Sequence, residues 1–179
     1  MIKIILRWLP FAVLATIICG LVYATVQQNY RQSANDPQIQ MAEDTVNALN
    51  GGQPADSVIP KNQVDISKSL APFVIIYKEN VQVSTSSAIL DGLPNPPSGI
   101  FDFVKIQGFE WFTWQPRQDL RFATVVQKYN GGYVLAARSI REVEKREIRM
   151  SFVVLAAWLV SLAGTFIALL ISPLFKKLF

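Results

Sequence analysis

The chain has 179 residues and a formal net charge of +4, and 51% of its residues are hydrophobic. This length accommodates one domain of ordinary size together with membrane segments. Histidine is absent and Cys19 is the only cysteine. The commonest metal ligands, general bases and thiol nucleophiles are therefore missing, so we expect neither an enzyme nor a bound cofactor.

The excess positive charge lies at the two ends of the chain. Four cations lie outside two long apolar runs, and the other basic residues equal the acidic ones in number. These four are Lys3, Arg7, Lys176 and Lys177. The central region is therefore neutral, which argues against a nucleic-acid partner. By the positive-inside rule, the terminal cations place both termini in the cytoplasm.

Residues 1–7 are expected to be a cytoplasmic N-terminus, and residues 8–26 a first transmembrane helix. A signal peptide is the alternative, because basic residues precede the run and Val22, Tyr23 and Ala24 form a passable cleavage site. The run is longer than the usual apolar core of a signal peptide, so we favour an uncleaved anchor.

Residues 27–150 form the predicted extracytoplasmic domain. Its first part, residues 27–50, is polar with a weak helical pattern. The pattern predicts a stalk helix that leaves the membrane, a break near Pro37 and a second helix over residues 38–50. A loop and a short turn then lead into the core.

The core is predicted to be an antiparallel sheet of five strands. They lie at 73–77, 81–85, 109–114, 120–128 and 133–138. The first two and the last two form hairpins, with β-branched runs around short turns. A short helix is expected at 99–107. In the strand at 109–114, Trp111 and Trp114 point to opposite sides, so both faces need cover and we expect this strand at the centre of the sheet.

The final helix is predicted from about Ser139 to Leu174. No charged residue occurs from Phe152 to Leu170, a stretch long enough to cross a hydrocarbon core of about 30 Å at about 1.5 Å per residue. We therefore predict a second transmembrane helix at 151–174 and a cytoplasmic C-terminus at 175–179.

A reverse topology is the alternative, because three cations lie just before the second apolar run. They are Lys145, Arg146 and Arg149. The first helix usually dominates the orientation, so we keep both termini inside.

One face of the final helix carries small residues through its apolar part. They are Ala157, Ser161, Gly164 and Ala168. Small faces let membrane helices approach closely, so we expect a second helix there. That helix is either the chain's own first one, where Ala12, Thr16 and Gly20 make a comparable face, or the same helix of a second copy in a homodimer. The alternative is that such residues are simply common in membrane helices.

Aromatic and basic side chains also suggest a ligand pocket. Tyr77, Trp111 and Trp114 supply apolar walls, and Arg117 and Arg121 supply donors for an anionic small molecule. The alternative is that the aromatic residues belong to the core and that the arginines are solvated.

Three stretches carry a resemblance to a known family. They read WQPR at 114–117, RFATVV at 121–126 and GYVLAARSIREVE at 132–144. Together with the strand pattern from Phe73 onward, they resemble the extracytoplasmic PAS-like sensor region, of the Cache type, of bacterial two-pass membrane signalling proteins. In such families the sheet binds a small ligand, and the helix that follows moves in response.

The resemblance implies an α+β fold, in which two transmembrane helices flank a PAS-like domain with a five-stranded antiparallel sheet and N- and C-terminal stalk helices. It also implies a bacterial sensor in the cell membrane, with signal transduction through the final helix. No kinase or cyclase domain follows Leu174, so we expect the signal to pass to a separate protein. A structural or assembly subunit of a cell-envelope complex, without a ligand, is the alternative.

Overall fold

A computed structural model describes residues 2–89 and 95–175 of the chain. They divide into two compact units: a helical pair made from residues 2–30 and 144–175, and a domain made from the described residues of 31–143. Residues 90–94, in the segment between the predicted strand at 81–85 and the predicted helix at 99–107, and the terminal cations Lys176 and Lys177 lie outside the described residues.

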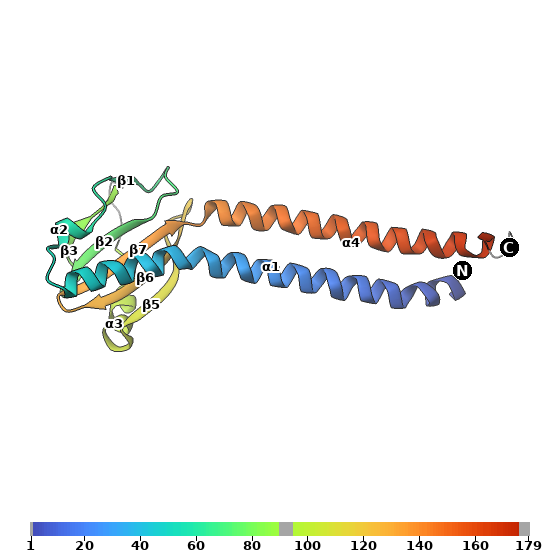
Figure 1. The fold of residues 1–179 in the computed structure, drawn as a ribbon, viewed down its shortest axis with the longest axis horizontal. Helices are drawn as coiled ribbons and strands as arrows, with labels where there is room; N and C mark the ends of the chain where they lie inside the picture. Colours follow the sequence, from blue (N-terminus) through green and yellow to red (C-terminus); the bar gives the residue numbers. More distant parts are fainter. Residues whose placement is uncertain (1, 90–94, 176–179) are drawn as a thin grey trace. The chain divides into compact units, whose positions relative to one another are not determined.

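The domain contains one five-stranded antiparallel sheet, as predicted (Figure 1). Its strands are β2 (Phe73–Lys78), β3 (Val83–Ser86), β5 (Phe109–Arg117), β6 (Leu120–Tyr129) and β7 (Gly132–Ser139). They lie in the order β3-β2-β7-β6-β5, so the first and last strands pair at the centre. The remaining elements of the domain are the helices α2 (Ala55–Val58) and α3 (Ser98–Gln107) and a two-stranded parallel sheet of β1 (Val64–Asp65) and β4 (Ala88–Ile89).

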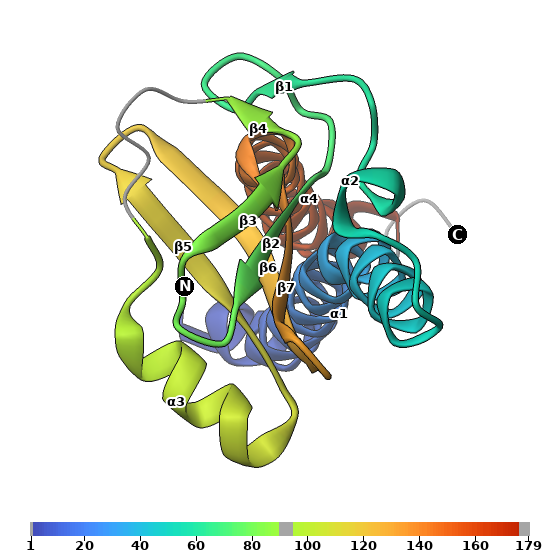
Figure 2. The same cartoon turned by 90° about the vertical axis from the view of Figure 1, so that its left-hand side faces the viewer.

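Helices cover both faces of the five-stranded sheet (Figure 2). The C-terminal turns of α1 (Ile2–Asn50) pack Ala42 and Val46 against Val74, Val125 and other apolar side chains on one face. On the other face, α3 contributes Phe101 and Val104 to a second apolar cluster. Residues 132–137 of β7 are all buried, because this strand has a neighbour on each side and a helix over each face.

The prediction that the aromatic strand is central is wrong, because β5 is at an edge of the sheet. Trp114 is buried against the core, with 4% of its surface exposed, whereas Trp111 on the opposite side of the strand is 56% exposed. Alternation places the two rings on opposite faces, and at the edge only one of those faces is covered.

The predicted break near Pro37 is also wrong, because α1 continues through this residue. A proline inside a helix costs about 3 kcal/mol, since it removes one hydrogen bond and crowds the preceding turn. Gln38, Ala42, Thr45 and Val46 follow it and are buried. We attribute the continuity of the helix to this burial, which offsets the cost of the proline.

The helical pair combines the N-terminal part of α1 with most of α4 (Arg141–Phe175). Both helices are long and apolar enough to cross a membrane. Most large apolar side chains of the pair are exposed.

Candidate functional site

The predicted ligand residues do not converge. Tyr77 is opposite Tyr133 in the β2 and β7 pairing, near the hairpin end of the sheet. Trp114 is opposite Phe122, near the other end of the strands. Trp111 and Arg121 lie on the sheet face covered by α1. Val125 packs on that face; Trp111 is its cross-strand partner, and Arg121 is four residues before it on β6. Arg117 is the last residue of β5 and is opposite Leu120. The five residues therefore occupy different ends and faces of the sheet.

The α3 side of the sheet is filled by aromatic packing. Tyr77 and Tyr133 each make an edge contact with Phe101, with ring centroids 5.1 and 5.2 Å apart. Phe122 makes ring contacts with Phe73 at 5.3 Å and with Trp114 at 5.9 Å. These separations are typical of packed aromatic pairs, so Tyr77 and Trp114 are core residues at these positions.

Burial raises the pKa of the Tyr77 phenol above its usual value, because the ionised form loses its hydration. The folded state then holds the proton more tightly than the unfolded state does. The contribution of Tyr77 to stability is complete below about pH 10 and is lost as the pH rises above that value.

We therefore expect the urea midpoint of the full chain to fall between pH 9 and pH 11, and to fall less in a Tyr77→Phe variant. Tyr23→Phe, a change in the helical pair, is the control. Equal alkaline losses of stability in the wild type and in the Tyr77→Phe variant would show that the phenol is not the titrating group.

A groove of about 280 Å³ lies beside β5. It is lined by Asn95, Pro97, Phe112, Thr113, Trp114, Gln115 and Pro116. Its walls combine aromatic surface with amide and hydroxyl groups, which is the usual composition of a small-molecule site. Of the five predicted ligand residues, only Trp114 borders it.

Residues 138–141 form the junction at which β7 leads into α4. Only Ile140 separates Ser139, the last residue of β7, from Arg141, the first of α4. The backbone N–H of Ile140 donates to the carbonyl of Arg121 at 3.1 Å, which extends the pairing with β6. The Ser139 hydroxyl accepts from the N–H of Arg141 at 3.4 Å. The helix therefore begins while the chain is still bound to the sheet.

Two arginines tie this junction to the turn at 65–70. Arg138 donates from Nε to the carbonyl of Leu70 at 3.3 Å, and Arg141 donates from Nη2 to the carbonyl of Lys68 at 3.0 Å. Asp65 orders this turn by accepting from the hydroxyl and N–H of Ser67 at 2.5 and 3.0 Å. These hydrogen bonds lower the pKa of Asp65, so they persist at neutral pH.

In the helical pair, a tryptophan of each helix donates a hydrogen bond to a threonine hydroxyl of the other helix. Trp8 of α1 donates from Nε1 to Thr165 Oγ1 at 3.0 Å, and Trp158 of α4 donates from Nε1 to Thr16 Oγ1 at 2.9 Å. Trp8 also makes an edge contact with Phe166 at 5.8 Å. Interhelical hydrogen bonds of this kind stabilise membrane helix pairs. The small residues of the apolar runs did not predict these contacts, although Trp and Thr are conspicuous polar groups in such runs.

The predicted small face of α4 is not the surface that packs against α1. Ala157, Ser161, Gly164 and Ala168 are exposed, and a Cβ added at Gly164 would meet no atom within 4 Å. Larger side chains occupy the contact, with Trp158, Leu162 and Thr165 partly buried. The small face is therefore available to another chain or to lipid.

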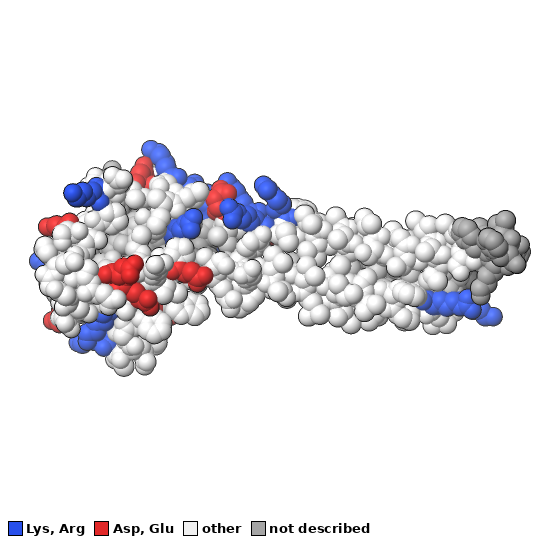
Figure 3. All heavy atoms as spheres, in the orientation of Figure 1, with Lys and Arg blue, Asp and Glu red and all other residues white. Residues whose placement is uncertain are grey.

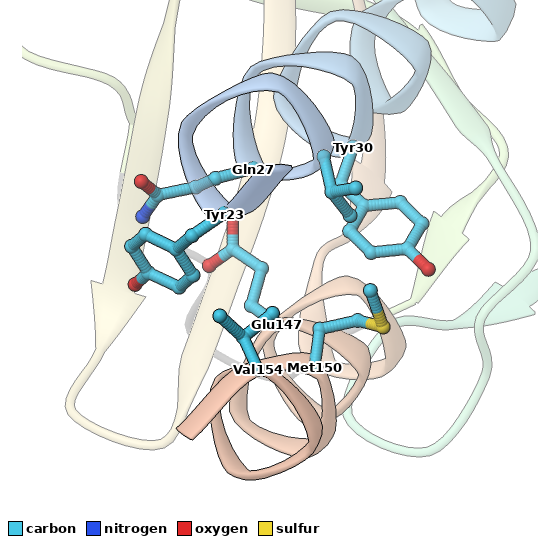
Figure 4. Close-up of a pocket in the computed structure, with 7 residues that line it drawn as sticks. Tyr23, Gln27, Tyr30, Glu147, Met150 and Val154 are labelled. Atoms are coloured by element: carbon cyan, nitrogen blue, oxygen red, sulfur yellow. The ribbon is translucent and has the colours of Figure 1, made fainter. Parts of the chain in front are cut away.

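A narrow cleft lies between the helices at the polar end of the pair (Figure 4). It is lined by Tyr23, Val26, Gln27, Tyr30, Glu147, Met150 and Val154. The space open to the centre of a water molecule is about 10 Å³, which is enough for about one water. This cleft is too small for a metabolite.

Comparison of the chain with known protein families, curated proteins and solved structures finds no match.

Proposed function

We propose that the chain is a bacterial two-pass membrane protein. Its extracytoplasmic PAS-like domain senses a small molecule or an envelope condition and relays the signal through α4 to a separate protein. The support for the PAS-like assignment is the resemblance in sequence, together with a single five-stranded antiparallel sheet that has a helix over each face. The support for the membrane assignment is the length and apolar composition of α1 and α4.

The junction between β7 and α4 carries this proposal. A central strand with neighbours on both sides leads through one residue into the helix. Arg138 at the end of that strand and Arg141 at the start of the helix both donate to the turn at 65–70. A ligand that shifts the equilibrium between two arrangements of the sheet would therefore shift the position of the helix start as well. A flexible linker at this point would absorb such a change.

We place the ligand in the groove beside β5 and test it by thermal-shift screening of the full chain against small metabolites. A ligand should stabilise the protein by about 2.7 kcal/mol at a hundredfold excess over Kd. Phe112→Ala should remove this shift, because Phe112 lines the groove. The control, Phe103→Ala, changes an exposed ring on α3 and should keep it. A shift that survives Phe112→Ala would place the ligand elsewhere.

A structural or assembly subunit without a ligand is the second candidate. The observation that favours it is the filled α3 side of the sheet, where aromatic pairs occupy the space next to Tyr77 and Trp114. Exposed aromatic side chains at Phe109 and Trp111 on the edge strand would then contact another envelope protein. Failure of every metabolite to stabilise the full chain would favour this candidate.

The proposed topology predicts that Asn95 is outside the cytoplasm. Asn95 is exposed, so Asn95→Cys in a Cys19→Ser background should react with an impermeant thiol reagent on intact spheroplasts. The Cys19→Ser parent is the unlabelled control. Reaction only after lysis would reverse the topology.

We also propose that the small face of α4 contacts a second copy. Because membrane helices with small residues approach closely, single cysteines at Ser161 and Ala168 should form homodimer crosslinks in the Cys19→Ser background. Gly164→Leu should weaken them. Its side chain would enter space that is open within one chain, so the helical pair itself should be unchanged. Crosslinks of equal strength at Val153, on another face of α4, would remove the support for this dimer.

A further inference from the structure

Acidic and basic residues are interleaved along the sequence from residue 144 to 149 of α4, but in the helix the acidic side chains are less exposed than the basic ones. Glu144 and Glu147 are half-buried, whereas Lys145, Arg146 and Arg149 are exposed. Figure 4 shows Glu147 pointing into the cleft between the helices. Glu147 therefore lies towards the inside of the helical pair, whereas the three basic side chains are exposed.

Exposed apolar side chains continue this basic face. Ile148 is 59% exposed and Phe152 is 66% exposed. Together with Lys145 and Arg149 they lie at the spacing of one face of a helix. Arg146 is three residues before Arg149 and borders this face. Figure 3 shows Lys and Arg side chains gathered along the start of α4, followed by an uncharged surface. This transition from cationic to apolar surface occurs within about two turns.

We propose that Arg146 and Arg149 bind the phosphate groups of anionic phospholipids. This inference rests on the proposed membrane location. At about 1.5 Å per residue, Arg149 lies about 5 Å and Arg146 about 9 Å before Phe152 along the helix. The polar layer on each side of the hydrocarbon core is about 5 to 7 Å thick. Arginine side chains are long enough to reach phosphates in that layer while the apolar neighbours contact acyl chains.

The chemistry favours a lipid over an acidic protein as the partner. A guanidinium group binds a phosphate through two parallel hydrogen bonds. An acidic protein would satisfy the charges, but would leave Ile148 and Phe152 against water or against a partner surface of mixed polarity. A phospholipid supplies the anion and the hydrocarbon in the same order as the helix presents its cations and apolar groups.

The test is native mass spectrometry of the full chain in a non-ionic detergent, titrated with phosphatidylglycerol or phosphatidylcholine. We expect tighter binding of phosphatidylglycerol. Arg146→Gln/Arg149→Gln should weaken that binding about 30-fold, if each cation contributes as it does at an anionic membrane surface. Lys105→Gln/Lys128→Gln removes the same charge from exposed positions of the domain and should change the affinity little.

Unchanged affinity in the arginine double variant would overturn the inference and point to an acidic protein as the partner. An equal loss in the lysine control would also overturn it, because net charge alone would then explain the binding. Alkaline carbonate extraction of membranes tests the membrane location separately from the binding of anionic lipid. If the wild type stays in the membrane but shows no preference for phosphatidylglycerol, only the lipid inference fails. If the wild type is extracted, the membrane location fails, and the inference with it.

Discussion

Gly132→Ala is expected to destabilise the domain by roughly 2 to 6 kcal/mol, because it combines backbone strain with a clash against the neighbouring strand β2. Gly132 has a φ of 150°, a backbone angle that L side chains rarely adopt. A Cβ at this position would lie 2.1 Å from the carbonyl oxygen of Tyr77 and 2.7 Å from the carbonyl carbon of Lys78. Both atoms are backbone of the neighbouring strand, so no side-chain rotation relieves the overlap.

The measurement is the urea midpoint of the full chain in detergent micelles, followed by pulse proteolysis of the domain. Gly99→Ala is a matched control, because its Cβ would meet no atom within 4 Å and it is located in α3. That substitution should leave stability unchanged or raise it by up to about 1 kcal/mol, since alanine favours helix. Equal midpoints for Gly132→Ala and the wild type would mean that β2 and β7 are not paired as described.

Trp114→Ala and Trp111→Ala should differ strongly, although the two rings are three residues apart on one strand. Trp114 is almost fully buried and contacts Phe122, so its truncation should cost roughly 3 to 5 kcal/mol. Trp111 is 56% exposed on the edge strand. We expect a loss below about 1 kcal/mol there, mainly from its cross-strand pair with Val125.

The same pulse-proteolysis assay measures both variants, and each tryptophan controls for the other. A cost above about 3 kcal/mol for Trp111→Ala would mean that a partner chain or the rest of the protein covers the outer part of β5. A small cost for Trp114→Ala would place this ring outside the core, and the assignment of β5 to the edge would need revision.

Local patterns in the sequence predicted most of the elements. The hairpin through Asn130 and Gly131 and the helix before β5 follow from turn residues and apolar spacing within short windows. The five-stranded antiparallel sheet follows from these hairpins, because neighbouring strands joined by tight turns must pair antiparallel. The two apolar runs predicted the helices of the helical pair from length alone.

Features that depend on distant parts of the chain were not predictable in this way. The order of the strands places β5 at an edge, but the alternation of Trp111 and Trp114 is equally compatible with a central strand. Pro37 predicted a break because of its local effect on a helix. The burial of Gln38 and Ala42 offsets that effect, but it depends on contacts that the local sequence does not reveal. The positions of the five predicted ligand residues relative to one another were not predictable either, because strand order and register determine which side chains meet.

The central position of β7 also constrains how the domain is made. Its partner β2 is synthesised early, but the two strands cannot pair until β3, α3, β5 and β6 have been synthesised. Pairing between residues far apart in sequence closes slowly, because a long loop must be ordered before contacts are gained. A nascent chain that stops before Gly132 would leave Val74 and Ile76 without their neighbours, and would be prone to aggregate. The apolar helix α4 leaves the ribosome directly after the strand that completes the sheet, so closure of the domain and synthesis of the second apolar helix fall within the same short interval.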